Sequence, residues 1–241
     1  NPQPNPAVHP FWIPEFLGDV ICVNGKTWPY LNVEPRQYRF RLLNGSNARF
    51  YDLTLSNGAP FIAIATDAGY LVNAVSTPNV LIAPGERYEV IVDFTGLAVG
   101  TQVTMMNSAN TPYPGGGPVD PGTTDTVMQF IVVNNTSGLP NTTIADGTPI
   151  RPTPLVPILN AHNPATGSIT RQLTINEVIG AGGPLELVVN NSKYNLKSYD
   201  PAAPARPIPV LPGCTTPLCR ETEIPAVGDT EIWEVINITA D

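Results

Sequence analysis

The chain contains few residues that could bind a metal ion or a nucleic acid. Of its 241 residues, two are histidines and three are cysteines, and 12 Lys and Arg stand against 20 Asp and Glu. His9 and His162 both lie beside loop residues, where a solvated side chain is the default interpretation. No metal site can be assembled from these scattered histidines and cysteines without large help from carboxylates. A net charge of −8 argues against a nucleic-acid partner.

Long apolar runs are also missing. No run reaches the ~18 residues that a membrane helix needs, and the Pro-rich and Asn-rich beginning of the chain cannot be the apolar region of a secretion signal. Charged residues make up 13% of the chain, about half of the roughly 25% usual in soluble domains. The 28 prolines and 20 glycines form about 20% of the chain, below the roughly 25–30% of a disordered low-complexity chain. We therefore expect a folded protein without a membrane span.

Proline spacing and residue alternation predict an all-β fold. Proline inside a helix costs ~3 kcal/mol, and within the longer proline-free windows apolar residues alternate with the period of two that strands show. Turn signals such as Asn44-Gly45 and Pro84-Gly85 separate these segments. Many short strands spaced in this way indicate a β-sandwich or a barrel. The expected strands are 19–23, 38–42, 51–55, 61–65, 79–83, 88–94, 101–106, 126–133, 171–175, 185–189 and 231–236.

The pattern changes after Val133. Six prolines occur between positions 140 and 164 with little alternation, which is typical of an extended, polyproline-like linker. We expect residues 1–133 to form one domain with a Pro-rich arm at 1–12, and residues 134–168 to form an interdomain linker. Residues 169–241 are expected to hold only the opening strands of another unit, because about 70 residues fall short of the ~100 of a complete sandwich.

Several ordered motifs resemble the multicopper oxidases. Val23-Asn24-Gly25-Lys26 begins the first motif, Pro84-Gly85-Glu86-Arg87 lies within a later one, and Met128-Gln129-Phe130 closes the expected domain. They are similar to the central domain of bacterial laccases of the spore-coat and bilirubin-oxidase type. The resemblance implies a cupredoxin-like Greek-key β-sandwich, followed by the Pro-rich linker and the start of a third, incomplete cupredoxin-like domain. It is carried by residues 23–35, 38–46, 66–69, 81–94, 128–130 and 223–237.

The resemblance also implies a function for the parent enzyme. Laccase-like oxidases couple the one-electron oxidation of phenolic or aromatic reductants to the reduction of O2 to water at copper sites, which are formed by many histidines and one cysteine. The family places its first His-Pro-x-His-x-His motif a few residues beyond the position of Asp241. This chain is therefore expected to be the structural middle portion, with no copper ligand and no catalytic residue, and to be inactive alone. Copper, O2, the reductant and the remaining cupredoxin domains are expected of the intact parent.

One glycine-rich loop, residues 111–122, is a candidate for contact with the reductant. It lacks the G-x-x-x-x-G-K-[ST] pattern of a phosphate-binding loop. In the laccase-like family the corresponding loop lies on the substrate side of the mononuclear copper. The resemblance thus implies that Tyr113 and Gly115, Gly116 and Gly117 shape the reductant's route, with an ordinary hairpin loop as the alternative.

The cysteines and one charged pair have structural interpretations. Cys214 and Cys219 are close enough in a Pro-rich segment to form a disulfide, with free thiols as the alternative. Cys22 lies in an apolar segment and is expected to be a small buried core residue. Glu86 and Arg87, between a Pro-Gly turn and a strand, are expected to form an ion pair that anchors the turn.

Two other classes of function share part of the pattern. A copper-free cupredoxin scaffold of the periplasm would carry the same motifs without the ligands. A cell-surface β-sandwich binding module of immunoglobulin type would share the composition but not the ordered motifs. The resemblance places the protein outside the cytoplasm, as a secreted, periplasmic, spore-surface or cell-surface protein. The unpaired strand edges of an unfinished unit are expected to favour self-association.

Overall fold

The structure is a computed structural model of the chain. It describes residues 15–67, 69–139, 141–151, 169–181, 183–190 and 231–239. The chain divides into two compact units, of which the first holds the described residues up to Arg151 and the second those from Ile169 onward. Every regular element among the described residues is a strand, so the prediction of an all-β fold is confirmed. None of these residues forms a helix with the length and apolar character needed to cross a membrane.

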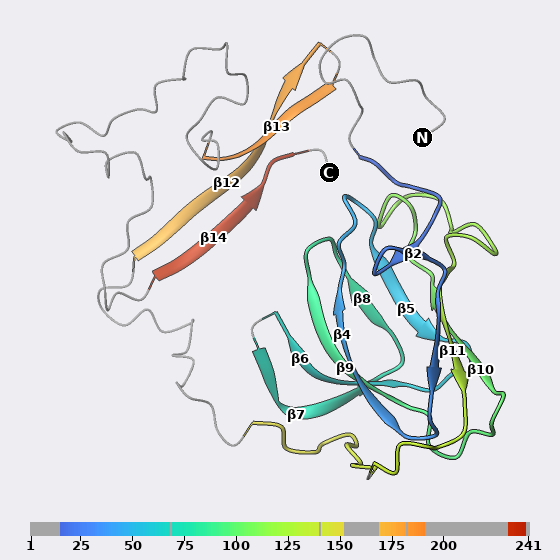
Figure 1. Cartoon of the computed structure of the whole chain (residues 1–241). Helices are drawn as coiled ribbons and strands as arrows, with labels where there is room; N and C mark the ends of the chain where they lie inside the picture. Colours follow the sequence, from blue (N-terminus) through green and yellow to red (C-terminus); the bar gives the residue numbers. More distant parts are fainter. Residues whose placement is uncertain are drawn as a thin grey trace. The chain divides into compact units, whose positions relative to one another are not determined.

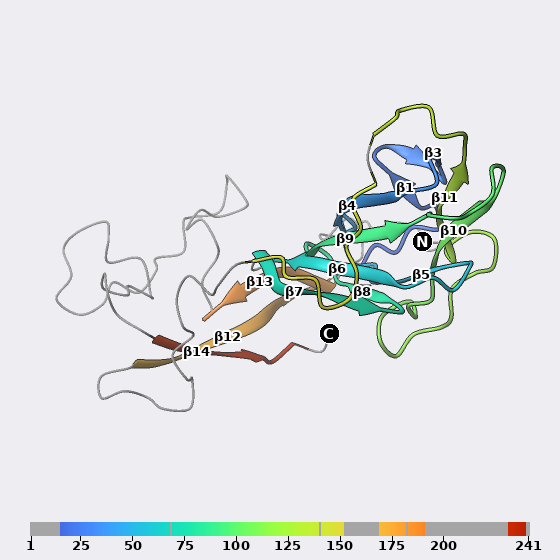
Figure 2. The same cartoon turned by 90° about the horizontal axis from the view of Figure 1, so that it is seen from below.

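The first unit is a sandwich of two sheets, whose strands can be followed in Figures 1 and 2. The larger sheet has the order β3-β11-β10-β5-β8, in which only β3 and β11 pair in parallel. The smaller sheet has the antiparallel order β4-β9-β6-β7. Their bounds are β3 Tyr30–Val33, β4 Gln37–Leu43, β5 Tyr51–Leu55, β6 Phe61–Thr66, β7 Gly69–Thr77, β8 Val80–Ile82, β9 Arg87–Asp93, β10 Gln102–Asn107 and β11 Thr126–Val132.

The core of this unit lies between the two sheets. Along β4, Tyr38, Phe40 and Leu42 pack against it while Arg39 and Arg41 are exposed, as the sequence alternation predicts. Phe130 from β11 is fully buried, and the centre of its ring lies 5.3 Å from that of Phe40. The core therefore consists of inward side chains from both sheets, with aromatic rings at its centre.

A small hairpin precedes the sandwich and corrects one prediction. Its strands are β1 (Cys22–Val23) and β2 (Lys26–Thr27), joined through Asn24 and Gly25, which both have positive φ angles. The prediction that Cys22 is a buried core residue is wrong, because its side chain is exposed. Ile21 is buried instead, and successive residues of an extended chain point to opposite sides.

The second unit contains a three-stranded sheet of order β13-β12-β14. The central strand β12 (Ile169–Gly180) pairs antiparallel with β13 (Gly183–Val189) and parallel with β14 (Glu231–Asn237). Arg171 and Glu231 form a two-point ion pair across β12 and β14, with N–O distances of 2.7 and 2.8 Å. Hydrogen bonds from Arg171 and Trp233 lower the pKa of Glu231 to about 2. A charged pair thus ties the two parallel strands together.

Candidate functional site

The glycine-rich loop connects β10 with β11, and one buried side chain ties both of its ends. Asn107, the last residue of β10, accepts hydrogen bonds at Oδ1 from the backbone N–H groups of Asp52 and Ala109, each at 3.0 Å. Its Nδ2 donates to the carbonyl oxygen of Thr124 at the other end of the loop, also at 3.0 Å. Because buried polar groups are costly unless they are paired, this arrangement fixes where the loop leaves and rejoins the sheet.

The tip of the loop is held by its own backbone. Thr111 and Gly117 exchange two backbone hydrogen bonds, of 2.7 and 3.0 Å, and the N–H of Gly116 donates to the carbonyl of Pro112 at 2.7 Å. A Cβ atom on Gly116 would lie 2.2 Å from the backbone of Thr111 and Pro112, whereas Gly115 and Gly117 face open space. Of the three glycines, Gly116 is therefore the one that the close approach of two backbone segments requires.

Tyr113 is packed by an aromatic neighbour below the loop. Its ring stacks on that of Phe50, with centres 4.6 Å apart and planes 18° apart, and the side chain remains partly exposed. Arg49, beside Phe50, is buried and donates to the Thr111 hydroxyl at 2.8 Å and to the Gly18 carbonyl at 2.6 Å. No pattern in the sequence predicted that Arg49 and Phe50 support the loop, because each contacts a residue that is distant along the chain.

A shallow hollow opens beside Tyr113 on the outer face of the larger sheet. Its volume is about 260 Å³. The Asp52 carboxylate lies in it and accepts hydrogen bonds from Asn79 Nδ2 at 2.5 Å and from the Ser108 hydroxyl at 2.9 Å. Tyr113 lines the hollow, whereas Gly115, Gly116 and Gly117 do not. The lining residues are Asp52, Asn79, Leu81, Ser108, Ala109, Asn110 and Tyr113.

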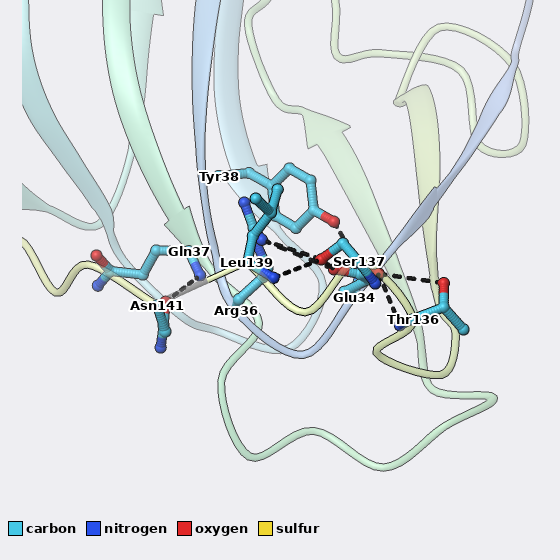
Figure 3. A network of polar contacts seen from close by, with 8 residues as sticks. All are labelled: Glu34, Arg36, Gln37, Tyr38, Thr136, Ser137, Leu139 and Asn141. Atoms are coloured by element: carbon cyan, nitrogen blue, oxygen red, sulfur yellow. Dashed lines mark hydrogen bonds and ion pairs between the residues drawn. The ribbon is translucent and has the colours of Figure 1, made fainter.

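A second polar cluster lies at the opposite end of β11. There, the Glu34 side chain binds the segment that follows β11 (Figure 3). Glu34 Oε1 accepts the backbone N–H groups of Thr136 and Ser137 at 2.9 and 2.8 Å, and the Ser137 hydroxyl donates to Oε2. Arg36 lies 3.7 Å from the same carboxylate. We call residues 134–151 the strap, and Glu34 fixes its beginning.

Gln37 holds the middle of the strap. Its side-chain amide accepts the N–H of Ile144 at 2.7 Å and donates to the Ile144 carbonyl at 3.0 Å, which replaces a backbone pair. Its backbone N–H donates to the Asn141 side chain at 3.2 Å. Burial opposes ionisation of Asp93, but hydrogen bonds from Thr95 and Gln37 outweigh it and lower the pKa of this carboxyl. The strap is thereby linked to both β4 and β9.

The end of the strap runs along β7. Ala74 exchanges backbone hydrogen bonds of 2.8 and 2.9 Å with Thr148 and Gly147, and the N–H of Ile150 donates to the Val72 carbonyl at 2.9 Å. The Ile144 and Ile150 side chains pack, together with Ile62, on a small buried cluster on the outer face of the smaller sheet, formed by Ile64, Ala74 and Ile91. The described strap residues thus cover part of that face and occupy the free edge of β7.

The Glu34 contacts predict a pH-dependent stability. Hydrogen bonds from Ser137 and Thr136 lower the pKa of Glu34 below its ordinary value of 4.5. The ionised carboxylate therefore stabilises the folded state above that value, and this contribution is lost as the pH falls through the lowered pKa. We expect Glu34→Gln to unfold at lower urea than the native chain at pH 7, and the gap to close in acid. Glu15→Gln, at an exposed position, should leave no such gap, and a gap independent of pH would contradict the assignment.

The described residues do not fit a copper site. No three His, Cys, Asp or Glu side chains of these residues come close enough together to hold a metal ion. Copper sites of the blue type need two imidazoles and a thiolate, and the residues that the structure describes include the exposed Cys22 but no histidine. His9, His162 and the possible disulfide partners Cys214 and Cys219 lie outside the described residues.

Comparison with known proteins identifies relatives of one family. Residues 13–114 match the family model described as multicopper oxidase. "Multicopper oxidase LPR1" of Arabidopsis thaliana is 39% identical over 238 residues, which cover 98% of this chain and 35% of that protein. A laccase of Bacillus subtilis is 36% identical over 239 residues, covering 99% of this chain and 39% of the laccase.

A solved structure gives the same result for the fold. The multicopper oxidase McoA of Aquifex aeolicus matches with a TM-score of 0.54 and 28% identity, over 78% of this chain and 37% of McoA. The chain thus spans little more than a third of the length of these relatives. The matches confirm the family resemblance and the cupredoxin-like fold that the motifs indicated: over nearly all of its length, this chain is similar to multicopper oxidases and laccases.

Proposed function

We propose that this chain is the structural middle portion of a laccase-like multicopper oxidase. The observation that carries the proposal is a two-sheet sandwich, similar in sequence and fold to these oxidases, whose described residues include no group that could hold a metal ion. In this proposal, residues 1–133 are the central cupredoxin-like domain, 134–168 the linker, and 169–241 the opening strands of the third domain. The chain then serves to hold its neighbouring domains in register.

The proposed parent enzyme oxidises small phenolic or aromatic reductants by single electrons and reduces O2 to water. Copper supplies the electron-transfer chemistry, and its ligands come from the remaining cupredoxin domains. Metal–nitrogen bonds of ~2 Å leave little tolerance for a shift of one domain. The hydrogen bonds of the strap to β4 and β7 support a spacer role, because they define where the chain leaves the sandwich. The relatives named as laccases support a location outside the cytoplasm.

The Tyr113 loop is proposed to border the route of the reductant. Tyr113 presents a partly exposed ring beside the hollow, and its position is fixed by Phe50. Gly115, Gly116 and Gly117 contribute differently, since they shape the loop and do not line the hollow. The loop thus offers one aromatic contact on a backbone of fixed shape.

Copper loading tests the proposal that this chain is structural and that the remaining domains hold the copper. We expect the 241-residue chain, incubated with Cu(I) or Cu(II) and then freed of excess metal, to retain no stoichiometric copper, to show no blue absorption band and to consume no O2 with a phenol. Tightly bound copper with a blue band would overturn the proposal. An oxidase that contains this chain and all its domains is the positive control and should show the band and the activity.

A further inference from the structure

The hollow beside Tyr113 contains a carboxylate without a cationic partner among the described residues. Ion pairs of these residues involve Glu34, Asp67, Glu89 and Glu231, but not Asp52. The two hydrogen bonds that the Asp52 carboxylate accepts from described residues come from the neutral groups of Asn79 and Ser108, one on each oxygen. An ionised carboxylate offers about four acceptor positions, so acceptor capacity and a full negative charge remain available.

The walls of the hollow combine this charge with apolar and aromatic surface. Leu81 lies directly opposite Asp52 in the pairing of β5 with β8, so the two side chains share the outer face of the sheet. Ala109 adds a methyl group, and Tyr113 provides an aromatic side chain at the rim. A cation above an aromatic face is attracted by the ring, and a carboxylate nearby adds a charge-assisted hydrogen bond. These are the contacts that recognise an organic ammonium group.

Other ligand classes fit less well. One carboxylate and two amides cannot supply the six to eight oxygens that Ca²⁺ prefers, and no metal-binding group exists among the described residues. An anion would meet the charge of Asp52. The volume of about 260 Å³ falls below the roughly 300–1,000 Å³ of pockets for drug-sized ligands, so a ligand with a single ring fits.

We propose that Asp52, Leu81 and Tyr113 form a binding site for a small organic ammonium ion. The ammonium N–H groups donate to the Asp52 carboxylate, and the hydrocarbon part contacts Leu81 and the ring of Tyr113. The site goes beyond the proposed oxidase function, because binding there requires neither copper nor electron transfer.

Two probes of the same shape test the proposal on the full chain. Benzylammonium and benzyl alcohol differ in charge but carry the same ring. We expect benzylammonium to shift the NMR signals of Leu81, Ala109 and Asn110 in a saturable manner, and benzyl alcohol to bind about tenfold more weakly because it lacks the charge-assisted contact. Equal binding of the two probes, or shifts scattered over the surface, would overturn the proposal.

Substitutions and salt then identify the residues involved. Asp52→Asn is expected to abolish the preference for benzylammonium, whereas Asp67→Asn, which removes the same charge in the turn after β6, should preserve it. Tyr113→Leu should weaken benzylammonium binding while the carboxylate remains. If Asp52→Asn does not fold, the salt dependence of binding to the native chain tests the role of Asp52. NaCl must then weaken the binding of benzylammonium and leave that of benzyl alcohol unchanged. Salt-independent binding of benzylammonium would refute the role of Asp52.

Discussion

Replacing Phe130 with alanine is expected to lower the free energy of unfolding of the first unit by about 3–5 kcal/mol, the range for large-to-small changes at buried aromatic positions. Phe130 is fully buried on β11, between β3 and β10. Its ring centre lies 5.1 Å from that of Phe94 and 5.3 Å from that of Phe40, which belongs to the other sheet. The substitution therefore leaves a cavity at the contact between the two sheets.

Urea unfolding followed by tryptophan fluorescence and by circular dichroism measures this effect. Tyr30→Ala, on the adjacent strand β3, removes an exposed aromatic side chain, and its effect should remain within about 0.5 kcal/mol, as is usual for surface changes. Phe130→Leu should fall between the two, because it retains most of the buried apolar volume. A loss below 1 kcal/mol for Phe130→Ala, on the order of a surface change, would show that Phe130 is not part of a well-packed core.

Alternation in the sequence predicted the strands whose two faces differ in polarity. β4 and β9 were predicted for this reason. The inward and outward residues of β4 lie as expected, whereas Ile91 on the outer face of β9 is buried in the cluster on which the strap packs. The sequence did not predict β3 or β7. β3 is four residues long and lies between Pro29 and Pro35, and the register of β6 with β7 shifts between Ala63 and Ala65. An irregular register removes the simple period of two on which sequence reasoning depends.

The position of the strap could not be predicted either. Its prolines indicate an extended segment, whereas Asp146 and Gly147 form a turn. The sequence does not reveal that Gln37 replaces a backbone partner for Ile144, more than a hundred residues away. The turn-anchoring pair shows the same limit. Arg87 forms its ion pair with Asp67 at 2.9 Å, and Glu86 accepts the N–H of Ala83 at 2.7 Å, so the expected Glu86–Arg87 pair is replaced by two separate contacts.

The hollow itself had no counterpart in the sequence. The glycine-rich pattern and the family resemblance pointed to Tyr113 as a contact of the reductant, and Tyr113 lines the hollow. Asp52 and Asn79 come from β5 and the turn before β8, which only the folded sheet brings together. A single polar side chain in a strand or in a turn carries no sequence signal.

The three loop glycines should respond very differently to alanine. Gly116→Ala is expected to lower the free energy of unfolding by about 1–3 kcal/mol, as overpacking does, because the new methyl group would lie 2.2 Å from the backbone of Thr111 and Pro112. The strain cannot be relieved by a side-chain rotation, since the colliding atoms are backbone. Gly115→Ala and Gly117→Ala face open space, and their effects should stay within about 0.5 kcal/mol. Urea midpoints of the three variants, measured side by side, provide the comparison.

In an oxidase that contains this chain, the same alanine variants test whether the shape of the loop affects the KM for the reductant. Relief of the clash requires Thr111 and Pro112 to move, and Tyr113 follows them directly, so Gly116→Ala must disturb the stacking on Phe50. If the loop borders the reductant's route, KM for phenols should rise with Gly116→Ala and remain unchanged with Gly115→Ala, while kcat for a small inorganic reductant stays constant. An unchanged KM across several phenols, with the expected loss of stability, would leave Gly116 a purely structural residue and remove the loop from the reductant's route.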